Sequence, residues 1–133
     1  MSGRPEVLFE GYTQNEILAL SKDVIESMIL TGEPVIFRAG SATILGEFRV
    51  DGRRLRIELA QIDGGGEGVL LSLGALARRF AQLNQLEAIE WIIDAVHCAQ
   101  PNLKLRGVLE RRGFVVTALP SVGQAYYLLE SFR

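Results

Sequence analysis

The feature that most constrains this chain is a run of glycines between an extended segment and a helical one. Residues 64–68 contain four glycines within five positions. Before them, residues 55–59 alternate between apolar and charged side chains, as a half-buried strand does. After them, apolar residues recur with a helical period from Val69 to Phe80. This order predicts an anion site, because glycines let backbone N–H groups face a ligand and the first helical turn has unpaired N–H donors.

The same pattern also fits a flexible turn that binds nothing, since glycine runs commonly join a strand to a helix. Asp63 and Glu67 flank or interrupt the glycines, and their carboxylates would repel a phosphate. No lysine or arginine lies in the loop. An anion site at this loop therefore needs support from other parts of the chain.

Composition indicates a single globular domain over residues 1–133, with 48% hydrophobic and 23% charged residues. The net charge of −2 argues against a nucleic-acid partner, and the short arginine clusters are interpreted as solvated faces. The one cysteine, Cys98, favours a reducing compartment, and with the adjacent His97 it cannot supply a zinc site. Residues 1–10 lack a signal-peptide layout and no apolar run is long enough to span a bilayer. We therefore expect a cytoplasmic protein without a metal or a membrane.

The remaining patterns predict an α+β domain with the element order β-α-β-β-β-α-β-α-β-β and a mixed, mostly antiparallel sheet flanked by helices. Thr13 and Glu16 form a capping box that begins one long first helix, which ends at Gly32. Asp51-Gly52 predicts a hairpin between residues 42–50 and 54–61. The strands before and after the glycine-loop helix should be parallel. Later elements are predicted at 88–96 (strand), from 101 to a stop at 113 (helix), and at 114–116 and 125–129 (a strand pair).

Two short motifs lie at fixed places in this order of elements. Residues 61–66 read Gln-x-x-Gly-x-Gly between the strand and the helix. Asn102 follows the central strand, and the helix after it ends in Gly113-Phe114. In this order and context the motifs resemble those of the GNAT superfamily of acyl-CoA-dependent N-acetyltransferases. The likeness in sequence covers about residues 55–115.

The resemblance implies a cofactor, acetyl-CoA or another acyl-CoA, held where the strands on either side of the glycine-loop helix part. Backbone groups near Ala60 and Ile62 would pair with its pantetheine arm, and loop amides would hold its pyrophosphate. The residues implied as cofactor-binding are Ala60, Gln61, Ile62, Gly64, Gly65, Gly66, Glu67, Gly68, Val69, Asn102 and Gly107.

The implied reaction is attack of an amine on a thioester, which needs a base for the amine and an acid for the departing thiolate. Family members often place the acid, a tyrosine, four residues before the glycine of Gly-Phe. Leu109 stands at that position and cannot donate a proton. Tyr126 and Tyr127 on the last strand are the replacement acids, and Glu58 is the candidate base.

The sequence leaves two main functions open, with a nucleic-acid partner bound by the arginine clusters as a weaker third option. The first is an N-acyltransferase that acts on a small-molecule or protein amine. The second is a catalytically weak or inactive GNAT-like module that binds CoA, or that works through a protein partner or a homodimer. The glycine loop and Asn102 favour the first, whereas Leu109 favours the second. The residues do not identify the acceptor.

Overall fold

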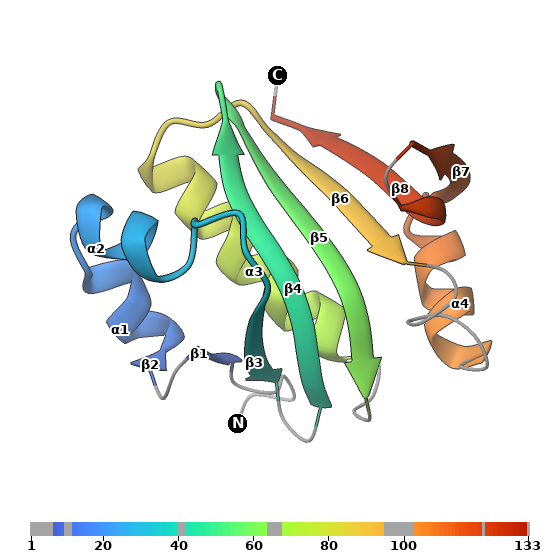
Figure 1. Ribbon diagram of the computed structural model, residues 1–133, viewed down its shortest axis with the longest axis horizontal. Coiled ribbons are helices and arrows are strands. Elements are labelled where there is room, and N and C mark those ends of the chain that lie inside the picture. The colour runs from blue at the N-terminus through green and yellow to red at the C-terminus, as the bar shows by residue number, and fades with distance from the viewer. Residues whose placement is uncertain are drawn as a thin grey trace.

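The centre of the molecule is an eight-stranded sheet with the order β2-β1-β3-β4-β5-β6-β8-β7 (Figure 1). The structure is a computed structural model that describes residues 7–9, 12–39, 42–63, 68–94, 103–120 and 122–132. Its strands are β1 (Val7–Phe9), β2 (Tyr12–Thr13), β3 (Val35–Ala39), β4 (Ala42–Asp51), β5 (Arg54–Asp63), β6 (Ala88–Asp94), β7 (Val115–Leu119) and β8 (Gly123–Ser131). The short strand β2 was not predicted.

Every strand pairing in the described residues is antiparallel except that of β5 with β6, which is parallel. The predicted fold class, a mixed and mostly antiparallel sheet flanked by helices, is therefore confirmed. The β4–β5 hairpin is also confirmed. Asp51 pairs with Arg54, and Gly52 has the positive φ of +64° that such a tight turn requires.

The helices are α1 (Gln14–Ala19), α2 (Lys22–Met28), α3 (Gly68–Leu83) and α4 (Leu103–Arg111). The Thr13–Glu16 capping box is present: the backbone N–H of Glu16 donates to Thr13 Oγ1 over 3.2 Å, and that of Thr13 donates to Glu16 Oε1 over 3.0 Å. None of the helices in the described residues is long and apolar enough to cross a membrane.

The prediction of a single first helix was wrong, because the chain breaks it into α1 and α2. Leu20 adopts an extended conformation (φ −70°, ψ 151°), and the hydroxyl of Ser21 then caps a new helix by accepting the backbone N–H of Val24 over 3.3 Å. On the second of these helices the apolar side chain of Val24 is 37% exposed.

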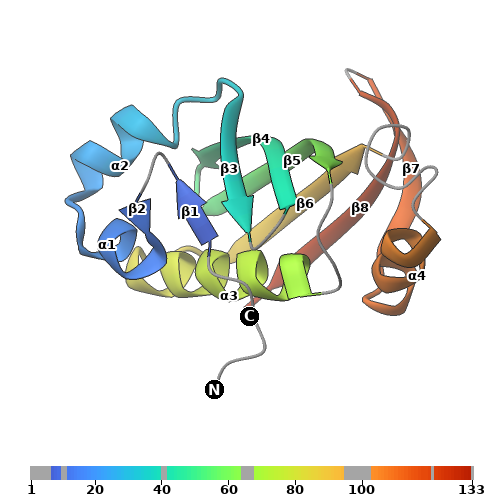
Figure 2. The ribbon, with the colours of Figure 1, turned by 90° about the horizontal axis from the view of Figure 1, so that it is seen from below.

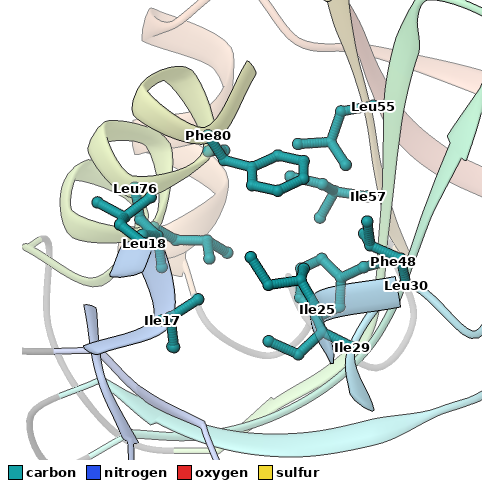
Figure 3. Close-up of a pocket in the computed structure, with 12 residues that line it drawn as sticks. Ile17, Leu18, Ile25, Ile29, Leu30, Phe48, Leu55, Ile57, Leu76 and Phe80 are labelled. Carbon is teal, nitrogen blue, oxygen red and sulfur yellow. The ribbon is translucent and has the colours of Figure 1, made fainter. Parts of the chain in front are cut away.

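The core lies on one face of the sheet, beneath α1, α2 and α3 (Figure 2). The inward side chains of α3 recur at helical spacing and pack on alternate residues of β4 and β5. Between the helices and the sheet a small apolar cavity of about 50 Å³ remains (Figure 3). It is lined by Ile17, Leu18, Ile25, Ile29, Leu30, Phe48, Leu55, Ile57, Leu73, Leu76, Ala77 and Phe80.

Candidate functional site

The parallel strands β5 and β6 part at their C-terminal ends. Their paired rows run from Arg54 with Ala88 to Leu59 with Ile93. Beyond that row β5 continues to Asp63 and pairs with β4, while β6 continues to Asp94 and pairs with β8. In Figure 1 the strands β5 and β6 diverge toward their arrowheads, which lie well apart. Within the described residues, the last part of β5 thus has a backbone edge that no strand covers.

A β-bulge on β5 lies at the same point. Leu59 pairs with Gly46 and Gln61 with Leu45, so Ala60 is an extra residue on the β5 side. The extra residue reverses the alternation of faces, and Ile62 becomes buried while Gln61 is exposed. Gly46 allows this close packing, because a Cβ atom on it would lie 3.0 Å from Leu59 Cδ2 and 3.2 Å from the carbonyl oxygen of Glu58.

The face of β4 and β5 away from the helix-covered core carries charged side chains. Arg49 lies opposite Arg56, and Glu47 lies opposite Glu58, in two neighbouring rows across the hairpin. These residues line a hollow of about 320 Å³. We call the hollow that these four residues line the charged hollow.

Glu58 lies opposite Ile92 of β6, one residue before the last β5–β6 pair, which is Leu59 with Ile93. Its side chain is 24% exposed, and Arg56 Nη2 lies 3.7 Å from its Oε1. Burial is the main cause that raises the pKa of Glu58, and the nearby charge of Glu47 raises it further, against the opposing effects of Arg56 and Arg49. A carboxylate with a raised pKa accepts a proton more readily near neutral pH than an ordinary one.

Tyr127 lies on the same face as Glu58, because both pair with Ile92 from opposite sides of β6. Its hydroxyl donates a hydrogen bond of 2.7 Å to Glu90 Oε2. That hydrogen bond is the main cause that raises the pKa of Tyr127, and burial adds to it. Arg54 and Arg56 hold the same Glu90 carboxylate, at 3.6 and 3.8 Å. The charged groups of β5 and β6 and the phenol of Tyr127 on β8 thus form one connected cluster.

The parted parallel pair, the helix that follows it and the order of the other elements are the arrangement that the sequence resemblance implied. The fold is GNAT-like. The predicted resemblance is therefore confirmed at the level of the fold.

No family model matches the chain. Among curated proteins it is similar to the "Riboflavin biosynthesis protein RibBA" of Bacillus mycoides, with 30% identity over 113 residues that cover 81% of this chain and 28% of that protein. It is also similar to the RibBA protein of Bacillus cereus (strain B4264), with 32% identity over 100 residues that cover 71% of this chain and 25% of that protein. The chain spans about a quarter of the length of these curated relatives.

Two solved structures are similar at a low level. One is a chain of the NatC complex bound to Gag peptide and CoA, with 16% identity and a TM-score of 0.42 over 72% of this chain and 64% of that one. The other is an acetyltransferase of the GNAT family from Staphylococcus aureus Mu50, with 14% identity and a TM-score of 0.41 over 87% of this chain and 84% of that one. Likenesses this distant say nothing about the activity of this chain.

The GNAT-like arrangement brings together some of the predicted cofactor-binding residues. Ala60, Gln61 and Ile62 lie on the part of β5 that extends beyond β6, and Gly68 and Val69 begin α3. Gly64, Gly65, Gly66, Glu67 and Asn102 lie outside the described residues.

Gly107 lies within α4 and is half-buried. Among the described residues, only Nη1 of Arg111 comes within 4 Å of a Cβ atom built on Gly107, at 3.3 Å. Arg111 belongs to the next turn of the same helix, and its side chain is flexible. Among the described residues, none outside α4 therefore comes within 4 Å of that position.

The predicted catalytic residues divide between the two faces. Glu58 and Tyr127 share the charged face, whereas Tyr126 is 2% exposed and packs in the helix-covered core. Leu109 is fully buried and also belongs to that core. Of the three predicted catalytic side chains, only Glu58 and Tyr127 lie on one surface.

Five residues of the charged hollow and the adjoining cluster were not predicted from the sequence: Glu47, Arg49, Arg54, Arg56 and Glu90. The Asp51-Gly52 motif predicted the hairpin but not its register. With Asp51 and Gly52 as the two turn residues, Arg49 would lie opposite Arg54. The observed turn residues are Gly52 and Arg53, and this register places Arg49 opposite Arg56 and Glu47 opposite Glu58. No local signal places Glu90 beside Tyr127, because that contact depends on the strand order β6-β8.

Proposed function

We propose that this protein is an N-acyltransferase that moves an acetyl or other acyl group from acyl-CoA to an amine. The observation that carries the proposal is the edge of β5 beyond its last pair with β6, at Ala60 to Asp63. An uncovered strand edge offers backbone donors and acceptors to an extended amide chain, and the pantetheine arm of CoA is such a chain.

Residues at the start of α3 fit the other end of the same substrate. Gly68 and Val69 open a 16-residue helix, whose first N–H groups and positive dipole end favour a pyrophosphate. Ala60, Gln61 and Ile62 would hold the pantetheine, while residues 64–69 would hold the pyrophosphate. Acyl-CoA supplies the activated carbonyl of a thioester.

Glu58 is the proposed base. Its carboxylate, with its raised pKa, lies one residue before the point where the strands part and would take a proton from the amine through a water molecule. The amine nitrogen then bonds to the acyl carbon, the carbon–sulfur bond breaks, and CoA leaves as a thiolate that takes up a proton. Tyr127 lies on this face and keeps its proton at neutral pH, so it is the better placed of the two predicted acids.

Thermal unfolding with and without acetyl-CoA tests the cofactor. Binding to the folded state at about 100 times Kd stabilises a protein by about 2.7 kcal/mol, so the midpoint should rise by several degrees. Gly64→Asp should abolish the rise by placing a carboxylate where the pyrophosphate binds. Gln85→Asp adds the same charge beyond the other end of α3, at a residue with φ of +58°, and should leave the rise intact. No rise at millimolar acetyl-CoA would overturn the proposal.

Glu58→Gln tests the chemistry. We expect thiol release from acetyl-CoA with an amine acceptor to fall roughly 100-fold or more, because a general base of this kind contributes about 10²–10⁴ to a rate. The thermal shift with acetyl-CoA should remain, since the glutamine side chain has nearly the same shape as glutamate. Glu33→Gln, at an exposed position between α2 and β3, is the control and should change neither quantity. Undiminished turnover in Glu58→Gln would remove Glu58 as the base.

A second function has one observation in its favour. Leu109 is fully buried at the position of the usual acid, and the proton of Tyr127 is already engaged with Glu90. The chain would then be a GNAT-like module that binds CoA and acts through a protein partner or a second copy. A thermal shift with CoA, together with no thiol release across a panel of amines, would favour this function over the enzyme.

A further inference from the structure

The charged hollow pairs like charges with like. Arg49 faces Arg56, and Glu47 faces Glu58, each directly across the β4–β5 hairpin. Like charges directly opposite each other destabilise a sheet, whereas exchanging one residue of each row would produce two attractive pairs. The observed arrangement therefore costs stability on a surface that the helices α1, α2 and α3 do not cover.

The ion pairs within the described residues only partly offset this cost. Arg56 is shared between Glu58 at 3.7 Å and Glu90 at 3.8 Å. Neither Arg49 nor Glu47 takes part in an ion pair with another described residue. The hollow thus has a carboxylate and a guanidinium available for a ligand.

The row of two arginines and the row of two glutamates have a fixed spacing and a fixed order along the strands. They are two residues apart along each strand, which separates them by about 7 Å. The row of carboxylates lies nearer the point where β5 and β6 part, because Glu58 precedes the last paired residue, Leu59. A ligand that matches both rows has a positive group toward that point and a negative group away from it.

We propose that the charged hollow binds the acceptor of the transfer reaction, and that this acceptor is an amine with an anionic group about 7 Å from its nitrogen. Glu47 and Glu58 hold the ammonium, and Glu58 then removes its proton. Arg49 and Arg56 hold the anionic group, a carboxylate or a phosphate, which guanidinium groups bind well. This inference rests on the proposed acyltransferase function and adds the class of acceptor.

Matched acceptors test the inference through thiol release from acetyl-CoA. The probe is 5-aminopentanoate, whose extended length fits the spacing, and the matched amine without the anionic group is pentylamine. We expect kcat/KM for 5-aminopentanoate to exceed that for pentylamine by about tenfold or more, which corresponds to about 1.4 kcal/mol. Glycine, whose two charged groups are too close together, should show no such advantage. 4-Aminobutyl phosphate, run beside 5-aminopentanoate, shows whether a phosphate or a carboxylate is preferred.

Arg49→Gln is the decisive variant, because Arg49 lines the hollow and has no ion pair among the described residues. It should raise KM for 5-aminopentanoate about tenfold and raise KM for pentylamine much less, because pentylamine has no anionic group for Arg49 to bind. Arg38→Gln removes the same charge from the neighbouring strand β3, at an exposed position outside the hollow, and should change neither rate. Equal rates with the two acceptors in the wild type, or equal losses in the two variants, would overturn the inference.

The acceptor-binding site and the acyltransferase function can be tested separately. A thermal shift with acetyl-CoA and turnover of pentylamine report the function even if the anionic group makes no difference. If acetyl-CoA does not bind, titration of 5-aminopentanoate alone, followed by NMR of the protein, still decides the ligand site. Binding that Arg49→Gln weakens and Arg38→Gln does not would support the charged hollow as a site, and absence of binding would overturn it.

Discussion

The two faces of the β4–β5 hairpin differ in what their side chains contribute. On one face Ile57 and Leu59 are almost fully buried beneath the helices. On the other, Arg56 and Glu58 remain partly exposed and belong to rows of like charge. These four residues alternate along one strand. One side of a strand can thus secure the fold while the other side is left free to bind a ligand at some cost in stability.

The largest expected difference between the faces is in the free energy of unfolding. Ile57→Ala should lower it by roughly 2–5 kcal/mol, because it removes a buried side chain and leaves a cavity next to the small one already present. Arg49→Ala on the other face should change it by less than about 0.5 kcal/mol. Urea unfolding of both variants measures the contrast. Similar losses in the two would show that the charged face also holds the fold together.

A smaller effect is expected for Tyr127→Phe, which removes the hydrogen bond to Glu90. The loss of unfolding free energy should be about 1 kcal/mol, since Arg54 and Arg56 still hold the Glu90 carboxylate. Thiol release should fall about 100-fold in Tyr127→Phe if the phenol is the acid. Tyr126→Phe should reduce thiol release less, because Tyr126 is buried on the opposite face of the sheet. Unchanged turnover with reduced stability would leave Tyr127 a purely structural residue.

The smallest effect concerns how stability depends on pH. Burial raises the pKa of Glu58 above its ordinary value of 4.5, so the folded protein disfavours the charged carboxylate. The stability that the fold gains from protonated Glu58 is fully present below the pKa of this residue in the unfolded chain. It is lost as the pH rises through the pKa of Glu58 in the folded protein. Glu58→Gln should therefore gain stability relative to the wild type between acidic and neutral pH. Thermal unfolding of Glu58→Gln and the wild type at several pH values measures this gain, and a gain toward acidic pH would contradict it.

Much of the fold was readable from the sequence because its signals are local. The Asp51-Gly52 motif predicted the hairpin, Gly113 with φ of +93° ended α4, and the apolar period of residues 69–80 marked α3. The division of the first helix was missed because its apolar residues keep a nearly continuous helical period across Leu20 and Ser21. A serine can cap a helix or sit within one, and only the extended backbone at Leu20 decides between them.

The candidate site was predictable only in part. Alternation on β8 shows that Tyr126 and Tyr127 face opposite sides, but not which one faces the helices. That choice depends on the register of β8 against β6, where Tyr126 pairs with Ile93 and Tyr127 with Ile92. Such a register joins segments far apart in the chain, and no short motif encodes it. The cofactor loop residues Gly64 to Glu67 and Asn102 remain predictions, since they lie outside the described residues.

The two-residue turn at Gly52-Arg53 limits how this surface could diversify among related proteins. Point substitutions at positions 47, 49, 56 and 58 would alter the preferred acceptor without disturbing the packed interior. A single inserted residue in the turn would instead shift one strand by one step and move its charged side chains to the interior. New specificities should therefore arise by exchange of side chains, with the length of this hairpin held constant.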